Sequence, residues 1–370
     1  MPLKQLLETV PLAGDIMRIR SVIRSRRHVR RRVRQLQTLL APGRYRIRWN
    51  LAERHYNVSS ENQTEAHRLF LQHNADRALI QRIVELTPPR SVHVPPTPGR
   101  EAAEGWADVL LVRGPCTLLL SHDGRHITRL FTDPIPVARI IDHWQRLHTS
   151  LAVPYVEPIS KAPPGYHAIR ETLMAGTTLG KSSRAQVFTG YSDFLRQCAR
   201  NACNVQGCYG RRSEILNLLE LPLPTWLQTT LSLRKHLLVP LLADSPALFC
   251  HADCHPANIV VLPNGGVGLI DLERAAWMPF FFDALYMLRM NNAIGEQLRT
   301  AYFRGDFDRQ LGALWQAAGQ TFRAELRLDY LLAVAIAHAL RDQYRHDPPS
   351  KRVRKLEKPS RALRPYCHST

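Results

Sequence analysis

The stretch His251–Glu273, with the sequence HADCHPANIVVLPNGGVGLIDLE, decides the fold of this chain. Two short apolar runs in it, residues 259–262 and 267–270, are separated by an Asn-Gly-Gly sequence at residues 264–266. Apolar runs around such a turn signal predict a β-hairpin. Because polar residues lie just before the first run and just after the second, the hairpin would bring polar side chains together at one end of its strands.

Three polar residues of this stretch suit the handling of phosphate and protons. Asn258 precedes the first predicted strand and Asp271 follows the second, so an amide and a carboxylate would lie side by side. These oxygen ligands suit Mg²⁺, which proteins usually hold through one or two carboxylates and the phosphates of a substrate. Asp253, on the loop that leads into the hairpin, could accept the proton of a hydroxyl nucleophile.

The order of these residues, H-x-D-x-x-x-x-N followed by an Asp after a strand, is the catalytic arrangement of protein kinases. In detail the stretch resembles the aminoglycoside phosphotransferase and choline kinase family, whose members carry H-G-D-x-H-x-x-N and I-D-x-E. Here Ala252 stands where protein kinases have Arg, and His255 lies two residues past the Asp. The segment from Ile270 to Ala275 is also similar to the lipopolysaccharide core-sugar kinases. The alternative is an ordinary hairpin with polar ends.

The resemblance implies an α+β fold of the bilobal, protein-kinase-like type. Residues 106–175 would form a small antiparallel β lobe, since short β-type runs there are split by the turn signals Gly114-Pro115 and Asp123-Gly124. Residues 176–346 would form a mostly helical lobe that carries the catalytic loop. Residues 347–370 would form a basic tail, and its part from Lys351 to Arg364 is expected to be mobile.

The part of the chain before the resemblance is predicted to be a helical N-terminal extension. Residues 1–50 hold a basic amphipathic segment, in which nine Arg and no acid lie between Arg18 and Arg34. Such a segment is typical of a membrane-surface or anion-binding helix, and a solvated helix packed on the body is the alternative. Residues 51–105 are expected to form a helix over 59–87 and then a Pro-rich linker.

The family pattern implies roles for residues of the quoted stretch. Asp253 would orient and deprotonate the acceptor hydroxyl, while Asn258 and Asp271 would hold Mg²⁺ against the phosphates of ATP. His255 would donate to the transferring phosphoryl group or to the loop backbone. His251 is expected to be structural and to bond the loop near Asp271, and a direct catalytic role is the alternative.

Two acids beyond these have different expectations. Asp283 lies where the family has an acid that caps a helix and hydrogen-bonds the backbone of the catalytic loop. Glu273 could reach a second metal ion, or it could pair with Arg274 or a neighbouring amide. The first acid is therefore expected to be structural, and the role of the second stays open.

The nucleotide-binding residues depart from the family pattern. The third predicted strand offers Arg129 where a Lys is usual, and the following helix offers Asp142 or no clear acid to hold it. An Arg on an exposed strand face is the alternative, and no Gly-rich loop precedes the strand. By resemblance to the family's hinge, backbone groups of Leu173, Met174 and Ala175 would hold the edge of adenine.

The chain is strongly basic and has no long apolar run. Its 370 residues include 50 Lys and Arg against 31 Asp and Glu, an excess of 19 positive charges, which implies an anionic partner. Nucleic acid is not favoured, because no aromatic residues interleave with the N-terminal Arg for base stacking. Seven unevenly spaced Cys, without a signal peptide, indicate reduced thiols. We therefore expect a cytoplasmic protein that lies peripherally on the inner membrane, with its anionic lipid surface as a partner.

The sequence thus predicts a phosphotransferase that uses ATP and Mg²⁺ and acts on the hydroxyl of a small molecule or glycolipid. An anionic glycan or glycolipid, with a lipopolysaccharide core sugar as leading candidate, fits the basic composition, whereas a cationic acceptor would need acids beside Asp253. A neutral sugar or amino alcohol fits if the excess charge lies only at the two chain ends. The missing Lys and Gly-rich loop favour a catalytically weak pseudokinase or scaffold that regulates a partner, and charge alone supports a nucleic-acid-binding protein.

Overall fold

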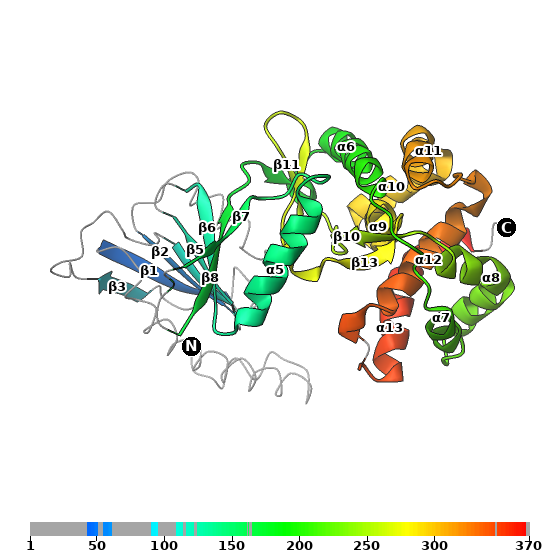
Figure 1. The fold of residues 1–370 in the computed structure, drawn as a ribbon, viewed down its shortest axis with the longest axis horizontal. Helices are drawn as coiled ribbons and strands as arrows, with labels where there is room; N and C mark the ends of the chain where they lie inside the picture. The colour runs from blue at the N-terminus through cyan, green and yellow to red at the C-terminus, as the bar shows by residue number, and fades with distance from the viewer. Residues whose placement is uncertain are drawn as a thin grey trace, which may run out of the picture. The chain divides into compact units, whose positions relative to one another are not determined.

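A computed structural model describes residues 43–50, 55–60, 90–94, 109–113, 116–121, 124–160, 162, 165–344 and 346–367. The chain divides into two compact units (Figure 1). The first unit consists of residues 1–141 and 155–173, and the second consists of residues 142–154 and 174–370. The division at Leu173 lies close to the predicted lobe boundary at residue 175.

The first unit is built on an antiparallel sheet with the strand order β3-β1-β2-β4-β5-β6-β8-β7. Its strands are β1 Gly43–Asn50, β2 His55–Ser60, β3 Arg90–Val94, β4 Val109–Arg113, β5 Cys116–Leu120, β6 His126–Phe131, β7 Val156–Ile159 and β8 His167–Thr172. The predicted strands over residues 109–131 are confirmed. Leu119, Leu130 and Ile169 are fully buried and form part of its core.

Strands β1, β2 and β3 correct the prediction of a helical N-terminal extension. In β1, with the sequence GRYRIRWN, Arg alternates with Tyr, Ile and Trp. This period of two is typical of a strand, whereas a helix needs a period of 3.6 residues. Residues 59 and 60, expected to begin a helix, end β2. The remainder of that predicted helix and the basic segment of residues 18–34 lie outside the described residues.

The second unit is mostly helical, as predicted. Its helices are α6 Arg184–Ala202, α7 Arg212–Leu219, α8 Thr225–Ala243, α9 Phe282–Tyr286, α10 Ala293–Arg304, α11 Asp308–Ala317, α12 Arg327–Ala339 and α13 Pro349–Ser360. The helix α5 Pro134–Leu147 spans the division between the units. Short strands form two small antiparallel sheets: β9 Thr177–Thr178, β11 Ile259–Val261 and β12 Val267–Leu269 in one, and β10 Ala247–Cys250 and β13 Ala276–Pro279 in the other.

Short 3-10 helices link several of these elements. They are η3 Leu179–Lys181, η4 Leu272–Arg274, η5 Met287–Arg289, η6 Ala324–Leu326, η7 Asp342–Tyr344 and η8 Arg361–Tyr366. Of these, η3 follows β9, η4 follows β12, and η5 continues directly from α9.

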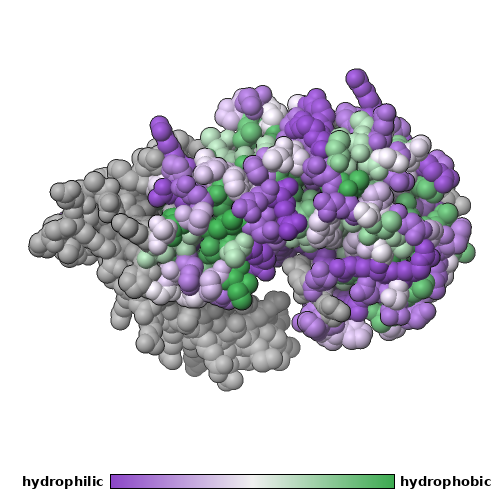
Figure 2. All heavy atoms as spheres, in the orientation of Figure 1, coloured by the Kyte–Doolittle hydropathy of each residue, from purple (hydrophilic) through white to green (hydrophobic). Residues whose placement is uncertain are grey.

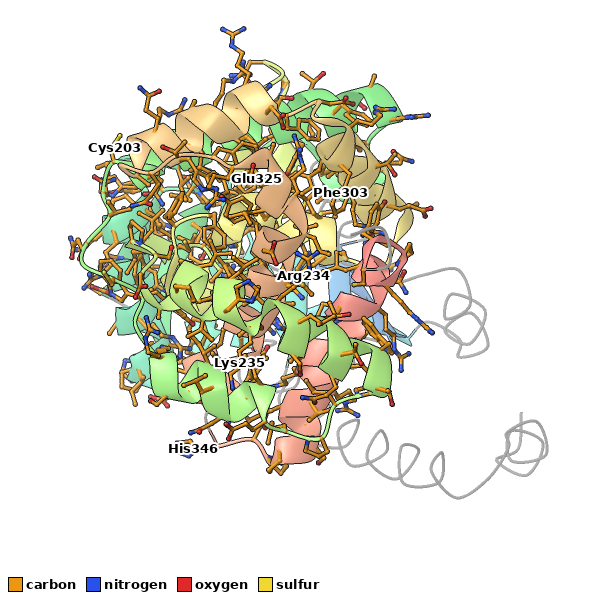
Figure 3. All side chains as sticks on the ribbon, turned by 90° about the vertical axis from the view of Figure 1, so that its right-hand side faces the viewer. Cys203, Arg234, Lys235, Phe303, Glu325 and His346 are labelled. Carbon is orange, nitrogen blue, oxygen red and sulfur yellow. The ribbon has the colours of Figure 1, made fainter. Side chains whose placement is uncertain are left out.

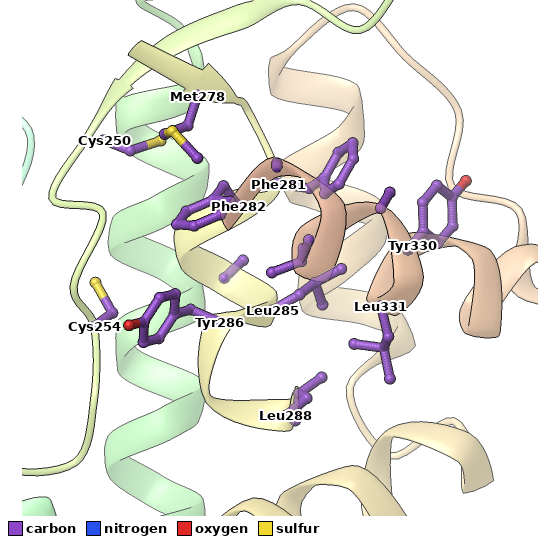
Figure 4. Close-up of a cluster of buried hydrophobic side chains, with 14 of the residues drawn as sticks. Cys250, Cys254, Met278, Phe281, Phe282, Leu285, Tyr286, Leu288, Tyr330 and Leu331 are labelled. Atoms are coloured by element: carbon purple, nitrogen blue, oxygen red, sulfur yellow. The ribbon is translucent and has the colours of Figure 1, made fainter. Parts of the chain in front are cut away.

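Helix α12 is the centre of the helical unit. Its residues 331–337 are fully buried, and it packs against α8, α9 and α13. Figure 4 shows aromatic and aliphatic side chains of the α9 region, including Phe281, gathered with Tyr330 and Leu331 of α12. At its first turn the fully buried Asp329 accepts from Arg234 of α8 at 2.9 Å. This acid is favourably placed at a helix N-terminus. Arg234 is labelled in Figure 3.

The basic C-terminal residues are an integral part of the fold, and the prediction of a mobile tail is wrong. Helix α13 and the following η8 cover residues 349–366, and Leu356 and Leu363 are fully buried. The ring of Tyr366 stacks on Phe303 at 4.0 Å. The sparse apolar residues pack inward, because the many Lys and Arg between them can keep their charged ends in water.

The hydrophilic surface fits the many charged residues of the chain, and the unpaired cysteines fit the expected reduced thiols. On the face drawn in Figure 2, hydrophilic side chains are spread widely over the helical unit, and hydrophobic atoms form small groups. All seven cysteines are free thiols. In the part of the chain that the structure describes, no helix is both long and apolar enough to cross a bilayer.

Candidate active site

The predicted hairpin is present and has the expected register. Ile259 of β11 pairs with Leu269 of β12, and the Ile270 N–H donates to the Asn258 carbonyl at 3.0 Å. Asn258 and Asp271 therefore lie at the same end of the two strands. Gly265 has φ +81° in the connecting turn, a conformation that glycine adopts at little cost.

The catalytic loop between β10 and β11 is held by a buried carboxylate. Ala252 has φ +60°, which is strained for a residue with a Cβ, and the family motif has Gly there. The Asp283 carboxylate accepts from the N–H groups of His251 at 2.7 Å and Ala252 at 2.8 Å. Burial raises the pKa of Asp283, and the nearby His251 and these N–H groups oppose that rise. Asp283 thus has the structural role expected of it.

His251 bridges the loop to the far end of the hairpin. Its Nε2 lies 2.9 Å from the Ile270 carbonyl, and its Nδ1 accepts from the Asp253 N–H at 3.3 Å. The imidazole therefore carries its proton on Nε2. Because both ring nitrogens bond backbone groups, His251 fixes the loop on which Asp253 lies.

Asp253 is held by residues from two other elements. It is 6% exposed, and its Oδ1 accepts from the hydroxyl of Tyr286 at 3.0 Å. Its Oδ2 lies 3.6 Å from Arg274 Nη1 and 3.9 Å from His255 Nε2. Burial raises the pKa of Tyr286 to about 12, so this phenol keeps its proton. Figure 4 shows Tyr286 directed toward the segment that carries Cys254.

Asn258 and Asp271 fit the requirements of a Mg²⁺ site. The Asn258 amide nitrogen donates to the Asp253 carbonyl at 3.1 Å, which leaves its oxygen available as an acceptor. Asp271 has φ +70° at the start of η4. No group of three or more His, Cys, Asp or Glu side chains suited to a metal ion occurs within the described residues. The protein would thus supply two oxygen ligands, and substrate phosphates and water would supply the others.

His255 is oriented to donate from Nε2. Its Nδ1 accepts from the Ala257 N–H at 3.2 Å, so the neutral ring carries its proton on the other nitrogen. Desolvation lowers the pKa of His255, although the charges of Asp253 and Asp271 oppose that change. A neutral imidazole with a free N–H can bond an oxygen atom near Asp253.

Arg129 lies in an ion pair, but with an acid other than the one predicted. Its Nε is 2.9 Å from Glu171 Oε1, and the two side chains are 13% and 8% exposed. The register of β6 with β8 makes them diagonal neighbours on one face of the sheet. Asp142 instead pairs with Arg146 one turn along α5, at 3.0 Å and in solvent. The partner of Arg129 is therefore Glu171 on the neighbouring strand and not Asp142 on the helix. Because the Arg129 side chain is only 13% exposed, it does not lie on an exposed strand face.

The predicted adenine-binding stretch lies at the division between the units. The Leu173 N–H already donates to the Arg125 carbonyl at 2.7 Å, so this donor is used within the first unit. In the second unit Met174 lies against Gly268, where an added Cβ would be 2.5 Å from the Met174 methyl carbon. The backbone of Met174 and Ala175 makes no hydrogen bond with another backbone group among the residues that the structure describes.

Gly176 ends the Glu-x-x-x-x-Gly pattern for a steric reason. It has φ +154°, and a Cβ there would lie 2.2 Å from the Val261 carbonyl oxygen of β11. Any larger residue would push the segment before β9 away from the hairpin. The first residue of the pattern, Glu171, is the acid that pairs with Arg129. Its last residue, Gly176, allows the close approach to β11.

Comparison with known proteins identifies the family. The family described as "Phosphotransferase enzyme family" matches residues 125–326, which is more than half of the chain. The chain therefore belongs to this family and is a kinase-type enzyme. The resemblance to aminoglycoside phosphotransferases expected from the sequence is confirmed.

Solved structures of the same kind are similar at low identity. Aminoglycoside phosphotransferase APH(4)-Ia is 14% identical, with 68% of this chain and 92% of that chain covered and a TM-score of 0.44. APH(3'')-Id from Streptomyces rimosus is 14% identical, with 62% and 91% covered and a TM-score of 0.41. The GDP and kanamycin complex of APH(2")-IIia is 16% identical, with 68% and 92% covered and a TM-score of 0.43. A comparison with curated proteins found no match.

Proposed function

We propose that this enzyme uses Mg²⁺ and transfers the γ-phosphate of ATP to a hydroxyl of an anionic glycan or glycolipid, with a lipopolysaccharide core sugar as leading candidate. The observation that carries the choice of acceptor is the charge beside Asp253. Its side-chain neighbours are Tyr286, Arg274 and His255, none of them acidic. A cationic acceptor would meet Arg274 at the base, which costs binding energy, whereas an anionic acceptor would be attracted.

The proton and phosphoryl steps follow from the bonds around Asp253. Tyr286 occupies Oδ1, so Oδ2 accepts the proton of the acceptor hydroxyl. The hydroxyl oxygen then forms its bond to the γ-phosphorus, the bond to the bridging oxygen breaks, and ADP leaves. Mg²⁺ held by Asn258 and Asp271 would neutralise the phosphate charge. The Nε2–H of His255 would donate to the transferring group.

ATP would be held by Arg129 and by the predicted hinge, residues 173–175. The buried ion pair with Glu171 fixes the guanidinium, which suits a contact with phosphate oxygens. The backbone of Met174 and Ala175 would hold the adenine edge, together with the carbonyl of Leu173. The basic N-terminal segment would bring the enzyme to an anionic inner-membrane surface, where glycolipid acceptors are reached.

Replacing Arg129 with Ala is expected to raise the KM for ATP or lower kcat by about tenfold or more, since charge-assisted contacts to phosphate contribute roughly 1.5–3 kcal/mol. Steady-state kinetics with varied ATP measure this effect. Glu171→Gln, which releases the guanidinium from its partner, should produce a smaller loss in the same direction. Unchanged kinetics in both variants would show that this pair does not serve the nucleotide.

The acceptor is tested by transfer of labelled γ-phosphate to purified core glycolipid, aminoglycosides, choline and simple sugars in parallel. We expect efficient labelling of the glycolipid and little labelling of the cationic compounds, because Arg274 lies 3.6 Å from the base. Labelling of an aminoglycoside or choline without the glycolipid would overturn the proposed acceptor. It would leave the phosphotransferase chemistry intact.

A further inference from the structure

Three arginines from separate segments gather behind the proposed base. Arg274 ends η4, Arg289 ends η5, and Arg341 follows α12. Arg289 and Arg341 are only 6% and 4% exposed. Burial of two guanidinium groups so close to Asp253 is unusual, because charged side chains are almost never fully buried unless they are paired.

Arg289 reaches the base through Tyr286. Its guanidinium carbon lies 4.0 Å from the centroid of the Tyr286 ring, whose hydroxyl donates to Asp253. The Arg289 Nε has no hydrogen-bond partner among the described residues. Burial lowers the pKa of Arg289, and Arg341 acts in the same direction, while Tyr286 and Asp253 oppose it.

Arg341 reaches the base through Arg274. Its Nη2 donates to the Arg274 carbonyl at 3.1 Å, and the Arg274 side chain extends to Asp253 Oδ2 at 3.6 Å. The Arg341 Nη1 is buried and lacks an acceptor in the described part of the chain. The side chain of Arg274 is half exposed, so the three arginines are reached by solvent at Arg274.

The other titratable side chains near these arginines contribute little net charge. The His338 ring lies 6.0 Å from that of Tyr286. Desolvation, reinforced by Arg289, Arg341, Lys355 and Arg274, holds the pKa of His338 well below its usual range, so the ring is neutral. Lys355 pairs with Asp347. Asp253 acts on Arg274 and Arg289, and Asp271 also acts on Arg274.

Two other largely buried arginines of the same unit show how such a group can be held. Arg234 pairs with the buried Asp329. Arg299, whose Nε also lacks a partner among the described residues, donates to the carbonyls of Leu288 and Met290. Arg289 and Arg341 form no ion pair with a carboxylate of the described residues. An uncompensated buried cation is costly, so an anion supplied by a ligand would be strongly favoured there.

We propose that Arg274, Arg289 and Arg341 form a subsite that binds a negatively charged group of the acceptor, a phosphate or a carboxylate, next to the hydroxyl that Asp253 deprotonates. This inference rests on the proposed function and adds that the acceptor must carry a phosphate or a carboxylate. The planar fork of each guanidinium matches two oxygens of such a group. The subsite selects acceptors that already carry an acidic group near the reacting hydroxyl.

The subsite is tested with the full chain in saturating Mg²⁺ and AMP-PNP, so that the nucleotide site is filled. Inorganic phosphate and acetate are titrated while the melting temperature or heat of binding is followed. We expect binding of at least one of these anions, weakened about tenfold or more in Arg341→Met and Arg274→Met. Arg212→Met is the matched control, since its guanidinium is exposed and paired with Asp244.

The KM values and the stabilisation by nucleotide distinguish a failure of the subsite from a failure of the proposed function. Arg289→Met and Arg341→Met should raise the KM for a glycolipid acceptor about tenfold and leave the KM for ATP unchanged. If a buried variant does not fold, Arg274→Met decides, because its side chain is half exposed. Anion binding equal to wild type in every folded variant, or none in wild type, would overturn the subsite. Absence of any stabilisation by Mg²⁺ and AMP-PNP would count instead against the proposed function.

Discussion

Asp253→Asn is expected to reduce phosphoryl transfer at least about 100-fold while the protein stays folded, since general-base catalysis contributes roughly 10²–10⁴-fold. The amide oxygen can still accept from Tyr286, whose hydroxyl lies 3.0 Å from Asp253 Oδ1, so the loop should keep its geometry. The amide cannot take up the proton of the acceptor hydroxyl.

The comparison requires kcat, the melting temperature and the stabilisation by Mg²⁺-ATP for wild type and Asp253→Asn. Asp244→Asn serves as the control, because this exposed acid pairs with Arg212 away from the loop. We expect full activity in the control and a normal melting temperature in both variants. A fully active Asp253→Asn enzyme would exclude this residue as the base.

Asp271→Asn is expected to lower kcat by roughly 1000-fold, because a bound metal ion contributes several kcal/mol and each 1.36 kcal/mol is a factor of ten. The backbone should be unaffected: Asp271 has φ +70°, and Asn is among the residues that tolerate this region best. The loss would therefore report the missing charge and not a distorted turn.

A titration of activity with Mg²⁺ measures this second effect. The variant should need far more Mg²⁺ than wild type, and addition of a chelator should abolish the activity of both. Asn264→Asp makes the reverse exchange in the hairpin turn, away from the metal ligands, and should leave the Mg²⁺ dependence as it is. If Asp271→Asn retains the wild-type Mg²⁺ dependence, the proposed metal site is wrong.

The catalytic stretch could be predicted because its information is local. The turn at residues 264–266 and the apolar runs beside it set the hairpin register, and that register brings Asn258 and Asp271 to one end. The loop contacts of His251 and Asp283 could be expected from the family pattern. The structure shows the hairpin register that the spacing predicted and the loop contacts of His251 and Asp283 that the resemblance implied.

The residues that the sequence did not reveal reach the site through tertiary packing. Tyr286 and Arg341 are 33 and 88 residues beyond Asp253 in the sequence, and only the packing of α9 against α12 brings their segments together. Arg274 was visible beside the I-D-x-E motif, but nothing local indicated its direction. Tyr286 follows Asp283 by three residues in the same helical segment, which is the one signal that could have found it.

Two errors at the chain ends share one cause. Runs of Lys and Arg in residues 1–50 and 347–370 were interpreted by their charge, which says little about secondary structure. The alternation in β1 and the apolar pair Leu356 and Leu363 carried the structural information instead. Similarly, Glu171 was overlooked as the partner of Arg129 because strand pairing is not visible in sequence spacing.

Phosphoryl transfer from ATP to an acidic glycolipid is tested most directly by one assay. The full chain is incubated with ATP labelled at its γ-phosphate, Mg²⁺ and an extract of membrane glycolipids and sugars, with Asp253→Asn in parallel. We expect a labelled phosphate ester on an acidic glycolipid with wild type, none without Mg²⁺, and almost none with the variant. Stabilisation by Mg²⁺-ATP with no labelled acceptor across the extract would contradict this expectation and would favour a regulatory nucleotide-binding scaffold.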